Sequence, residues 1–263
     1  MDLNKLNLIK KDILNIPLDE KKKNYEFIGL YVDGTSTFTY EKAAWSIHGF
    51  RTFSQYCYPI YLFVSCASPD KEIKAIVSKF SDIRVVLIPS LPSPVLYNEW
   101  MFNNCFYLIP EKYQKILSFQ EDGGIISFGW EDYVSKKPYS FLGALWKSDI
   151  EALSPQFKLQ TLKYCNGGVA YRKLSDLLKC CEFVKAHGGQ HKFFSGVKIN
   201  NNLVQDNGWL AEDLMFNAVG HTFEIFYSIT PEDCNKFSLE PIELDLFLDK
   251  DNLKRPLAFH KID

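Results

Sequence analysis

An apolar run near the middle of the chain ends in two acids and two glycines: Ile116-Leu117-Ser118-Phe119-Gln120-Glu121-Asp122-Gly123-Gly124. Residues 116–119 have the composition of a buried strand, and strands of open α/β sheets tend to hold ligands just beyond their carboxyl ends. We therefore expect Glu121 and Asp122 to face a ligand. Because Asp-Gly is also a strong signal for a tight turn between two strands, a plain turn is an equal alternative on these residues alone.

The region before this run alternates between strands and helices. Buried-type strands are expected at 27–32, 60–65 and 83–88, and helices at 40–53 and 70–80. Such an alternation predicts parallel strands joined by right-handed crossovers, as in doubly wound nucleotide-binding folds. The fold class we expect is α/β, with a mostly parallel central sheet flanked by helices and a Rossmann-like N-terminal half.

The second half of the sequence is less regular. The expected elements are helices at 97–103, 175–187 and 212–219 and strands at 141–146 and 166–171. The polar residues between 187 and 208 predict a loop or lid. We therefore expect an irregular C-terminal half.

The N-terminal region differs from the rest in composition. Residues 3–15 predict a short amphipathic helix, and a polar break follows it before the first strand. The organisation we expect is a helical extension at 1–24 and a single domain at 25–263. Five lysines between residues 10 and 23 offer peripheral contact with an anionic membrane surface, although a solvated helix is the stronger expectation.

Composition narrows the class of protein. The chain has 263 residues, 46% of them hydrophobic, which is enough to bury a large core. Its 30 basic and 32 acidic residues are well mixed, so nucleic-acid binding is not expected. The seven cysteines include no C-x-x-C pair and indicate neither a zinc cage nor a disulfide framework. With neither a signal-peptide core nor an apolar run of membrane-helix length, a cytoplasmic protein is expected, at most touching the inner face of the membrane.

The usual phosphate-binding loops are missing from the sequence. Neither G-x-G-x-x-G nor G-x-x-x-x-G-K-[ST] occurs. A nucleotide-binding sheet without such a loop must neutralise a diphosphate in another way, most commonly with a divalent ion held by carboxylates. Asp122 is placed for this role, because Mg²⁺ typically takes one or two carboxylates together with phosphate oxygens.

Six short motifs follow one another along the chain. They are Phe119-Gln120-Glu121-Asp122-Gly123, Tyr139-Ser140-Phe141-Leu142-Gly143-Ala144-Leu145-Trp146, Asn166-Gly167-Gly168-Val169-Ala170-Tyr171-Arg172, Glu212-Asp213, Phe237-Ser238-Leu239-Glu240 and Phe259-His260. In this order they resemble a bacterial family of GT-A-type glycosyltransferases, often filed as a domain of unknown function, whose members read Q-x-D-G, D-Y-I-G-A-P-W, G-N-G-G-F-S-L-R, E-D, F-S-x-E and F-H. The resemblance covers about residues 97–261 and implies a GT-A-like fold.

The resemblance also implies a metal site and a donor site. Asp122 and His260 would hold a divalent cation, Mn²⁺ or Mg²⁺, with Asp122 in the place of the last acid of the Asp-x-Asp motif. Gln120 stands where the first acid is usual, so metal dependence stays open, and Glu121 either compensates or points into the core. The other donor-binding residues implied are Asp33, Trp146, Asn166, Gly167, Gly168 and Lys261. Structural alternatives stay open for most of these: a turn at Asp33 or Asp122, packing of Trp146, a β-bulge at 166–168 and a surface position for His260.

Glu212 and Asp213 correspond to the acid pair that supplies the general base in inverting GT-A enzymes. Such a base takes the proton from the acceptor hydroxyl as it attacks the anomeric carbon. Asp213 is slightly favoured for this role. The alternative is that both acids complement the dipole at a helix N-terminus, which is worth roughly 0.3–1 kcal/mol.

These implications together define the expected function. It is a metal-dependent, inverting glycosyltransferase that moves a sugar from a nucleoside-diphosphate sugar to a saccharide or lipid-linked saccharide, in bacterial surface polysaccharide biosynthesis. One rival is a catalytically inactive module that binds sugar nucleotides or glycans, which Gln120 favours. A weaker rival is a sugar-nucleotidyltransferase, because residues 31–34 lack the basic glycine-rich loop that those enzymes need.

Overall fold

The N-terminal half folds as a parallel Rossmann-like unit. The computed structural model describes residues 3–146, 148–160, 165–205, 210–239 and 256–260. The elements of the first half are β1 (Phe27–Asp33), α2 (Tyr40–Phe53), β2 (Ile60–Ser65), α3 (Asp70–Lys79), β3 (Ile83–Ile88), α4 (Pro94–Asn103), a 3-10 turn (Cys105–Leu108) and β4 (Lys115–Phe119). β1 pairs in parallel with β2 and with β4, and β2 pairs in parallel with β3. The predicted alternation of strands and helices is confirmed.

Two later strands complete the central sheet. They are β6 (Phe141–Leu145) and β8 (Cys165–Lys173), and the six-stranded order is β3-β2-β1-β4-β8-β6. β8 pairs antiparallel with both of its neighbours, so the other five strands share one direction. The expected α/β class, with a mostly parallel central sheet flanked by helices, is confirmed. Because β8 is reversed, its first residues lie at the edge of the sheet where β4 ends.

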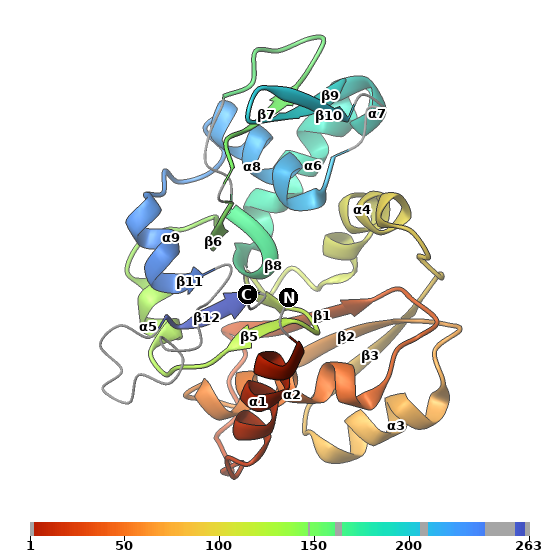
Figure 1. Ribbon diagram of the computed structural model, residues 1–263, viewed down its shortest axis with the longest axis vertical. Helices are drawn as coiled ribbons and strands as arrows, with labels where there is room; N and C mark the ends of the chain where they lie inside the picture. Colours follow the sequence, from red (N-terminus) through yellow and green to blue (C-terminus); the bar gives the residue numbers. More distant parts are fainter. Residues whose placement is uncertain (1–2, 147, 161–164, 206–209, 240–255, 261–263) are drawn as a thin grey trace.

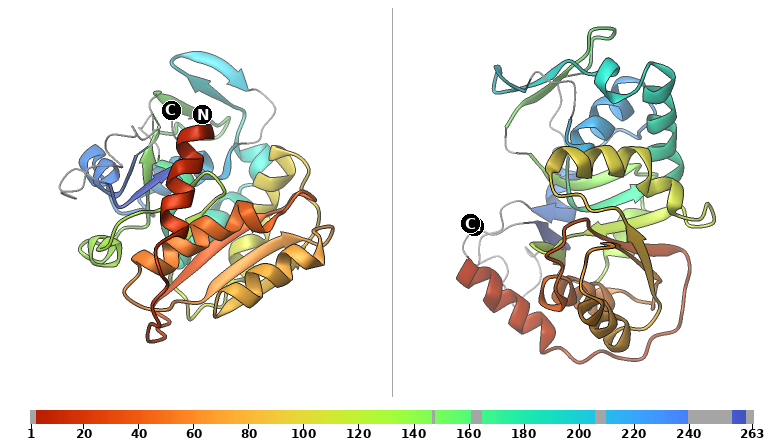
Figure 2. Two further views of the ribbon diagram at one scale, coloured as in Figure 1. Left: turned by 60° about the horizontal axis from the view of Figure 1, so that its bottom comes forward. Right: turned by 90° about the vertical axis from the view of Figure 1, so that its right-hand side faces the viewer.

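Helices cover both faces of this sheet. The remaining helices are α1 (Leu3–Leu14), α5 (Trp130–Ser135), α6 (Leu174–Ala186), α7 (Gln190–Phe193), α8 (Glu212–Thr222) and α9 (Pro231–Phe237). α2 and α3 lie on one side, whereas α4, α6 and α8 lie on the other (Figures 1 and 2). α1 lies across α2 with Ile9 and Ile13 buried. None of the helices in the described ranges is long and apolar enough to cross a membrane.

Two small sheets lie outside the central one. One joins β7 (Ile150–Leu153), β9 (Gly196–Ile199) and β10 (Asn202–Gln205), and the other joins β5 (Gly123–Ile125), β12 (Ala258–His260) and β11 (Ser238–Leu239). The prediction of a loop over 187–208 is therefore wrong, because α7 and the β9–β10 hairpin occupy part of that range. The antiparallel pairing of β9 with β7 supplies backbone partners that the local sequence does not reveal.

Candidate functional site

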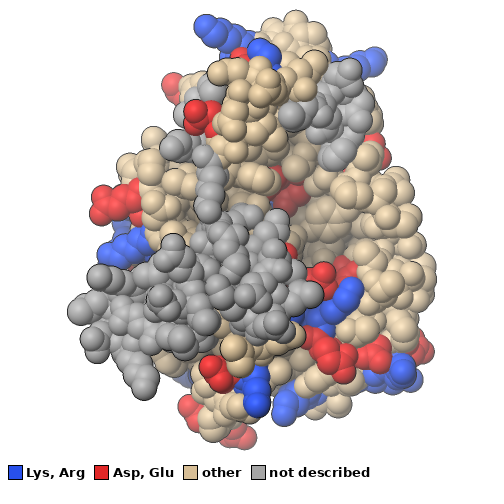
Figure 3. All heavy atoms as spheres, in the orientation of Figure 1, with Lys and Arg blue, Asp and Glu red and all other residues tan. Residues whose placement is uncertain are grey.

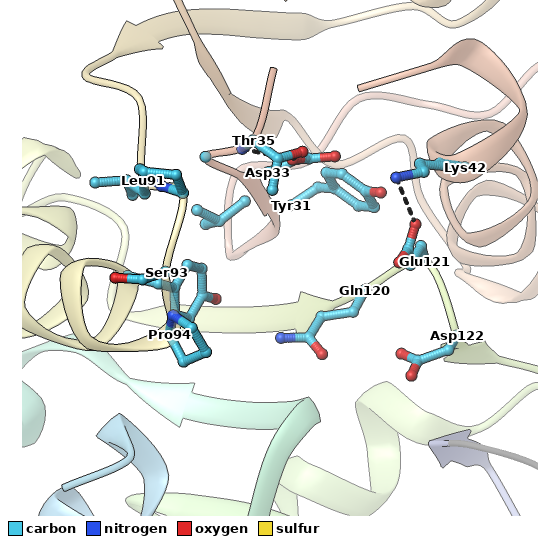
Figure 4. Close-up of a pocket in the computed structure, with 14 residues that line it drawn as sticks. Tyr31, Asp33, Thr35, Lys42, Leu91, Ser93, Pro94, Gln120, Glu121 and Asp122 are labelled. Carbon is cyan, nitrogen blue, oxygen red and sulfur yellow. Dashed lines mark hydrogen bonds and ion pairs between the residues drawn. The ribbon is translucent and has the colours of Figure 1, made fainter. Parts of the chain in front are cut away.

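A cavity lined by both polar and apolar side chains lies beyond the carboxyl ends of β1 and β4. Its volume is about 380 Å³. The residues that line it include Tyr31, Asp33, Thr35, Lys42, Ser93, Pro94, Tyr97, Gln120, Glu121 and Asp122. The side chains from β1 face those that follow β4 (Figure 4). The cavity thus occupies the edge at which open α/β sheets bind ligands.

Asp122 and His260 meet beside this cavity. After β4 the chain turns through residues 120–122 into β5, where Gly123 pairs with His260 of β12. His260 Nε2 lies 3.2 Å from Asp122 Oδ1, and the two side chains are 5% and 19% exposed. The pairing of two short strands therefore brings together the two residues expected to hold a cation.

Gly168 makes room for the His260 ring. It lies near the start of β8, where the pairing with β6 is interrupted between Cys165 and Ala170. A Cβ atom on Gly168 would be only 2.2 Å from His260 Nε2. Asn166 Oδ1 accepts a hydrogen bond from the Gly168 N–H at 2.7 Å. The residues 166–168 thus occupy an irregularity of the strand, as one alternative expected, and Gly168 lies against the His260 ring.

Glu121 points outward at the rim of the cavity. Its carboxylate is 51% exposed and lies 3.4 Å from Lys42 Nζ. Its carbonyl oxygen accepts a hydrogen bond from Trp45 Nε1 at 2.8 Å. The alternative that Glu121 points into the core is therefore wrong. Acidic and basic side chains are interspersed over the face of the molecule shown in Figure 3.

Asp33 stabilises a turn and also lines the cavity. Its Oδ1 atom accepts hydrogen bonds from the Thr35 N–H at 2.9 Å and from the Thr35 hydroxyl at 2.6 Å, which is the pattern of a side-chain-stabilised turn. The same residue lines the cavity at the end of β1.

Glu212 is held in a buried ion pair with Arg172. The two Arg172 Nη atoms donate to the two Glu212 carboxylate oxygens at 2.8 and 2.7 Å, and both residues are buried. Arg172 also donates from Nε to the Ser118 hydroxyl and from Nη2 to the Gly167 carbonyl, each at 3.0 Å. Sequence reasoning missed this network. The signal was present, because an arginine that follows Val-Ala-Tyr on a central strand needs a buried partner.

Asp213 lies beside this network but makes different contacts. Its Oδ2 atom accepts a hydrogen bond from the Gly167 N–H at 3.0 Å. Burial and the neighbouring Glu212 carboxylate raise the pKa of Asp213 to about 6, although hydrogen bonds from backbone N–H groups and the Arg172 charge act in the opposite direction. Both acids occupy the first turn of α8, as the helix-dipole alternative requires. Among the residues that the structure describes, Glu212 is held in an ion pair and Asp213 is not.

Four of the expected donor-binding residues do not line the cavity: Asn166, Gly167, Gly168 and Trp146. Trp146 is partly buried and packs against the hydrophobic core, and it does not line the cavity. Lys261 lies outside the described residues. Over the described ranges there is also no group of three or more His, Cys, Asp or Glu side chains arranged to hold a metal ion. Asp122 and His260 therefore offer two protein ligands, which suits a cation that takes its other ligands from phosphate and water.

Comparison with known proteins identifies a family for this chain. Residues 82–260 match the family described as "Protein of unknown function (DUF5672)". No curated protein matches the sequence significantly. Among solved structures, mouse xyloside xylosyltransferase 1 in its apo form aligns at 10% identity and a TM-score of 0.47, over 90% of this chain and 97% of that one. The 4-diphosphocytidyl-2C-methyl-D-erythritol synthase of Anaerococcus prevotii aligns at 9% identity and a TM-score of 0.39, over 65% of this chain and 78% of that one. Likenesses this distant say nothing about activity.

Proposed function

We propose that this chain, which belongs to the DUF5672 family, is a glycosyltransferase that uses a nucleoside-diphosphate sugar as its donor. The observation that carries the proposal is the contact of Asp122 with His260 beside the cavity at the carboxyl edge of the sheet. A carboxylate oxygen suits Mn²⁺ or Mg²⁺, and of these two cations Mn²⁺ is the better match for an imidazole nitrogen. When bound, the cation would offset the negative charge of the departing diphosphate.

The residues of the chain itself supply binding and proton transfer in this proposal. Asp33 and Gln120 line the cavity and would contact the nucleotide, and the exposed Lys42–Glu121 pair would border it. Asp213 would act as the general base, because a carboxyl group with a pKa of about 6 is ionised at neutral pH and still basic enough to take a proton. Glu212 is left to position Gly167 and Asp213 through Arg172.

The acceptor and the setting are proposed from the order of the sequence motifs. The acceptor would be a saccharide or lipid-linked saccharide, used in bacterial surface polysaccharide synthesis at the inner face of the membrane. Transfer with inversion is the stereochemistry that a single base at Asp213 supports.

The rival proposal is an inactive module that binds sugar nucleotides. Gln120 favours it, because this neutral side chain lines the cavity where a second metal-binding carboxylate would be expected. The two proposals differ in turnover and agree in nucleotide binding. An assay of turnover therefore separates them.

The first experiment is calorimetric titration with UDP, GDP and CMP, with and without Mn²⁺. The proposal expects one nucleotide to bind, and Asp122→Asn and His260→Ala should each remove the part of the affinity that depends on Mn²⁺. Asp132→Asn, which changes an exposed acid on α5, is the matched control and should bind like the wild type. Affinity that is unchanged in Asp122→Asn would count against the metal site.

The second experiment measures hydrolysis of the donor sugar and its transfer over a panel of acceptors. Asp213→Asn should keep the affinity for the donor but lose turnover. Nucleotide binding without any turnover in the wild type would support the rival module. Full turnover in Asp213→Asn would remove Asp213 from the role of base.

A further inference from the structure

The N-terminal helix brings a lysine close to the Asp122 site. Lys10 lies on α1 next to the buried Ile9, which helps to fix the helix against α2. Its Nζ atom lies 5.3 Å from the centroid of the Trp45 ring, a distance at which a cation is attracted to an indole face. Lys10 is only partly exposed, whereas the next residue, Lys11, is exposed.

Trp45 connects this lysine with both halves of the site. Its indole N–H donates a hydrogen bond to the carbonyl oxygen of Glu121, the residue that precedes Asp122 in the sequence. Its ring stacks on Phe259, directly before His260, with centroids 5.8 Å apart and an angle of 24° between the planes. Lys10 therefore packs on Trp45, whose contacts position the residues that precede Asp122 and His260.

The charges around Lys10 are those of the site itself. Burial lowers the pKa of Lys10, the carboxylates of Glu121 and Asp122 act to raise it, and the ammonium of Lys42 acts to lower it. A half-buried ammonium loses hydration, and this loss is offset when an anion binds beside it. A bound diphosphate would be such an anion.

We propose that Lys10 binds the diphosphate of the donor, so that the helix at the N-terminus forms part of the donor site. The inference rests on the proposed function and extends it to a segment that precedes the matched region 82–260. A lysine is a point charge that suits phosphate oxygens without fixed geometry. It would complement a cation held by only two side chains, Asp122 and His260.

The test compares three variants of the full chain. Lys10→Met keeps most of the stem of the side chain and removes its charge, Lys10→Arg keeps the charge, and Lys11→Met changes the exposed neighbour on the same helix. Each is titrated in Mn²⁺ with UDP or GDP, whichever binds the wild type, with its monophosphate and with inorganic pyrophosphate. Lys10→Met should weaken binding of the diphosphates by about tenfold or more, as loss of a charge-assisted hydrogen bond does. Binding of the monophosphate should change much less, and Lys11→Met should bind like the wild type.

A pH series gives a second readout that a purely structural role would not produce. The affinity of the wild type for the diphosphate should fall as the pH rises through the lowered pKa of Lys10, because the ammonium loses its proton. Lys10→Arg should keep its affinity over that range, since a guanidinium stays charged. This comparison holds even if Lys10→Met does not fold.

The outcomes separate the inference from the proposed function. If Lys10→Met binds diphosphates as tightly as Lys11→Met does, the role of Lys10 is refuted and the proposed function stands. The same holds if Lys10→Arg and the wild type lose affinity together at high pH. A wild-type protein that binds neither a nucleoside diphosphate nor pyrophosphate in Mn²⁺ would overturn both.

Discussion

Replacing Glu212 with glutamine should destabilise the fold more than most single substitutions do. Glu212 and Arg172 are 5% and 1% exposed, and they are joined by two hydrogen bonds of 2.8 and 2.7 Å. The substitution leaves the Arg172 charge buried with only neutral acceptors, among them the Ser118 hydroxyl and the Gly167 carbonyl. Removal of one partner from a buried ion pair costs about 3–5 kcal/mol. The loss would be a large part of a free energy of unfolding that is typically about 5–15 kcal/mol.

Urea unfolding followed by circular dichroism measures this loss for Glu212→Gln, Arg172→Met and the double variant. Each single variant should lose about 3–5 kcal/mol, and the double variant should lose clearly less than the sum, because it removes both charges together. Glu99→Gln is the control, since Glu99 pairs with His191 on the surface and should change stability by less than about 1 kcal/mol. A loss below about 1 kcal/mol in Glu212→Gln, or losses that simply add in the double variant, would refute the reasoning.

Three more outcomes follow from other contacts. Gly168→Ala would place a methyl group 2.2 Å from His260 Nε2, so the ring must leave Asp122 and Mn²⁺-dependent nucleotide binding should be lost in calorimetry while circular dichroism keeps the native signal. The pKa of Asp213 is raised to about 6, so its ionisation should lower the melting temperature as the pH rises from about 4 to 6. Asp213→Asn should abolish that part of the pH dependence, and a melting profile identical to that of the wild type would contradict the burial of the charge. Burial acts to raise the pKa of Asp233, but hydrogen bonds from Lys137 and Tyr139 lower this pKa to about 2. The ionised Asp233 carboxylate should therefore stabilise the fold fully above pH 4, and this stabilisation should be lost as the pH falls through 2. Acid titration of Asp233→Asn, followed by fluorescence, should lack this step.

The N-terminal half was predictable because its signals are local. Each strand from β1 to β3 is a short apolar run, and each is followed by a helix that starts at or directly after a polar residue, namely Thr39, Asp70 or Ser93. The strand at 60–65 was placed at its observed bounds, and the strand at 27–32 lacked only Asp33. Parallel strands need such crossovers, so the order of the elements also predicted the direction of the sheet.

The meeting of Asp122 with His260 could not be derived from local patterns. It depends on the pairing of β5 with β12, two strands of three residues each that lie far apart in the sequence. The hairpin of β9 and β10 escaped prediction for the same reason, since strands of four residues are stabilised by their partners rather than by their own periodicity. No sequence pattern indicated that Lys10 lies near Asp122. The helical period places Ile9 and Ile13 toward the core, but nothing in it ties α1 to residue 122.

The position of β1 inside the sheet has a practical consequence for trimmed versions of the protein. A fragment cut to residues 82–260 would keep β3 and β4 but lose both strands that connect them in the order β3-β2-β1-β4. β4 would then expose a row of unsatisfied backbone groups along a newly created border, which favours aggregation. Soluble expression of this family member therefore requires sequence upstream of the recognised boundary, and failure of the short form would carry no information about enzymatic competence.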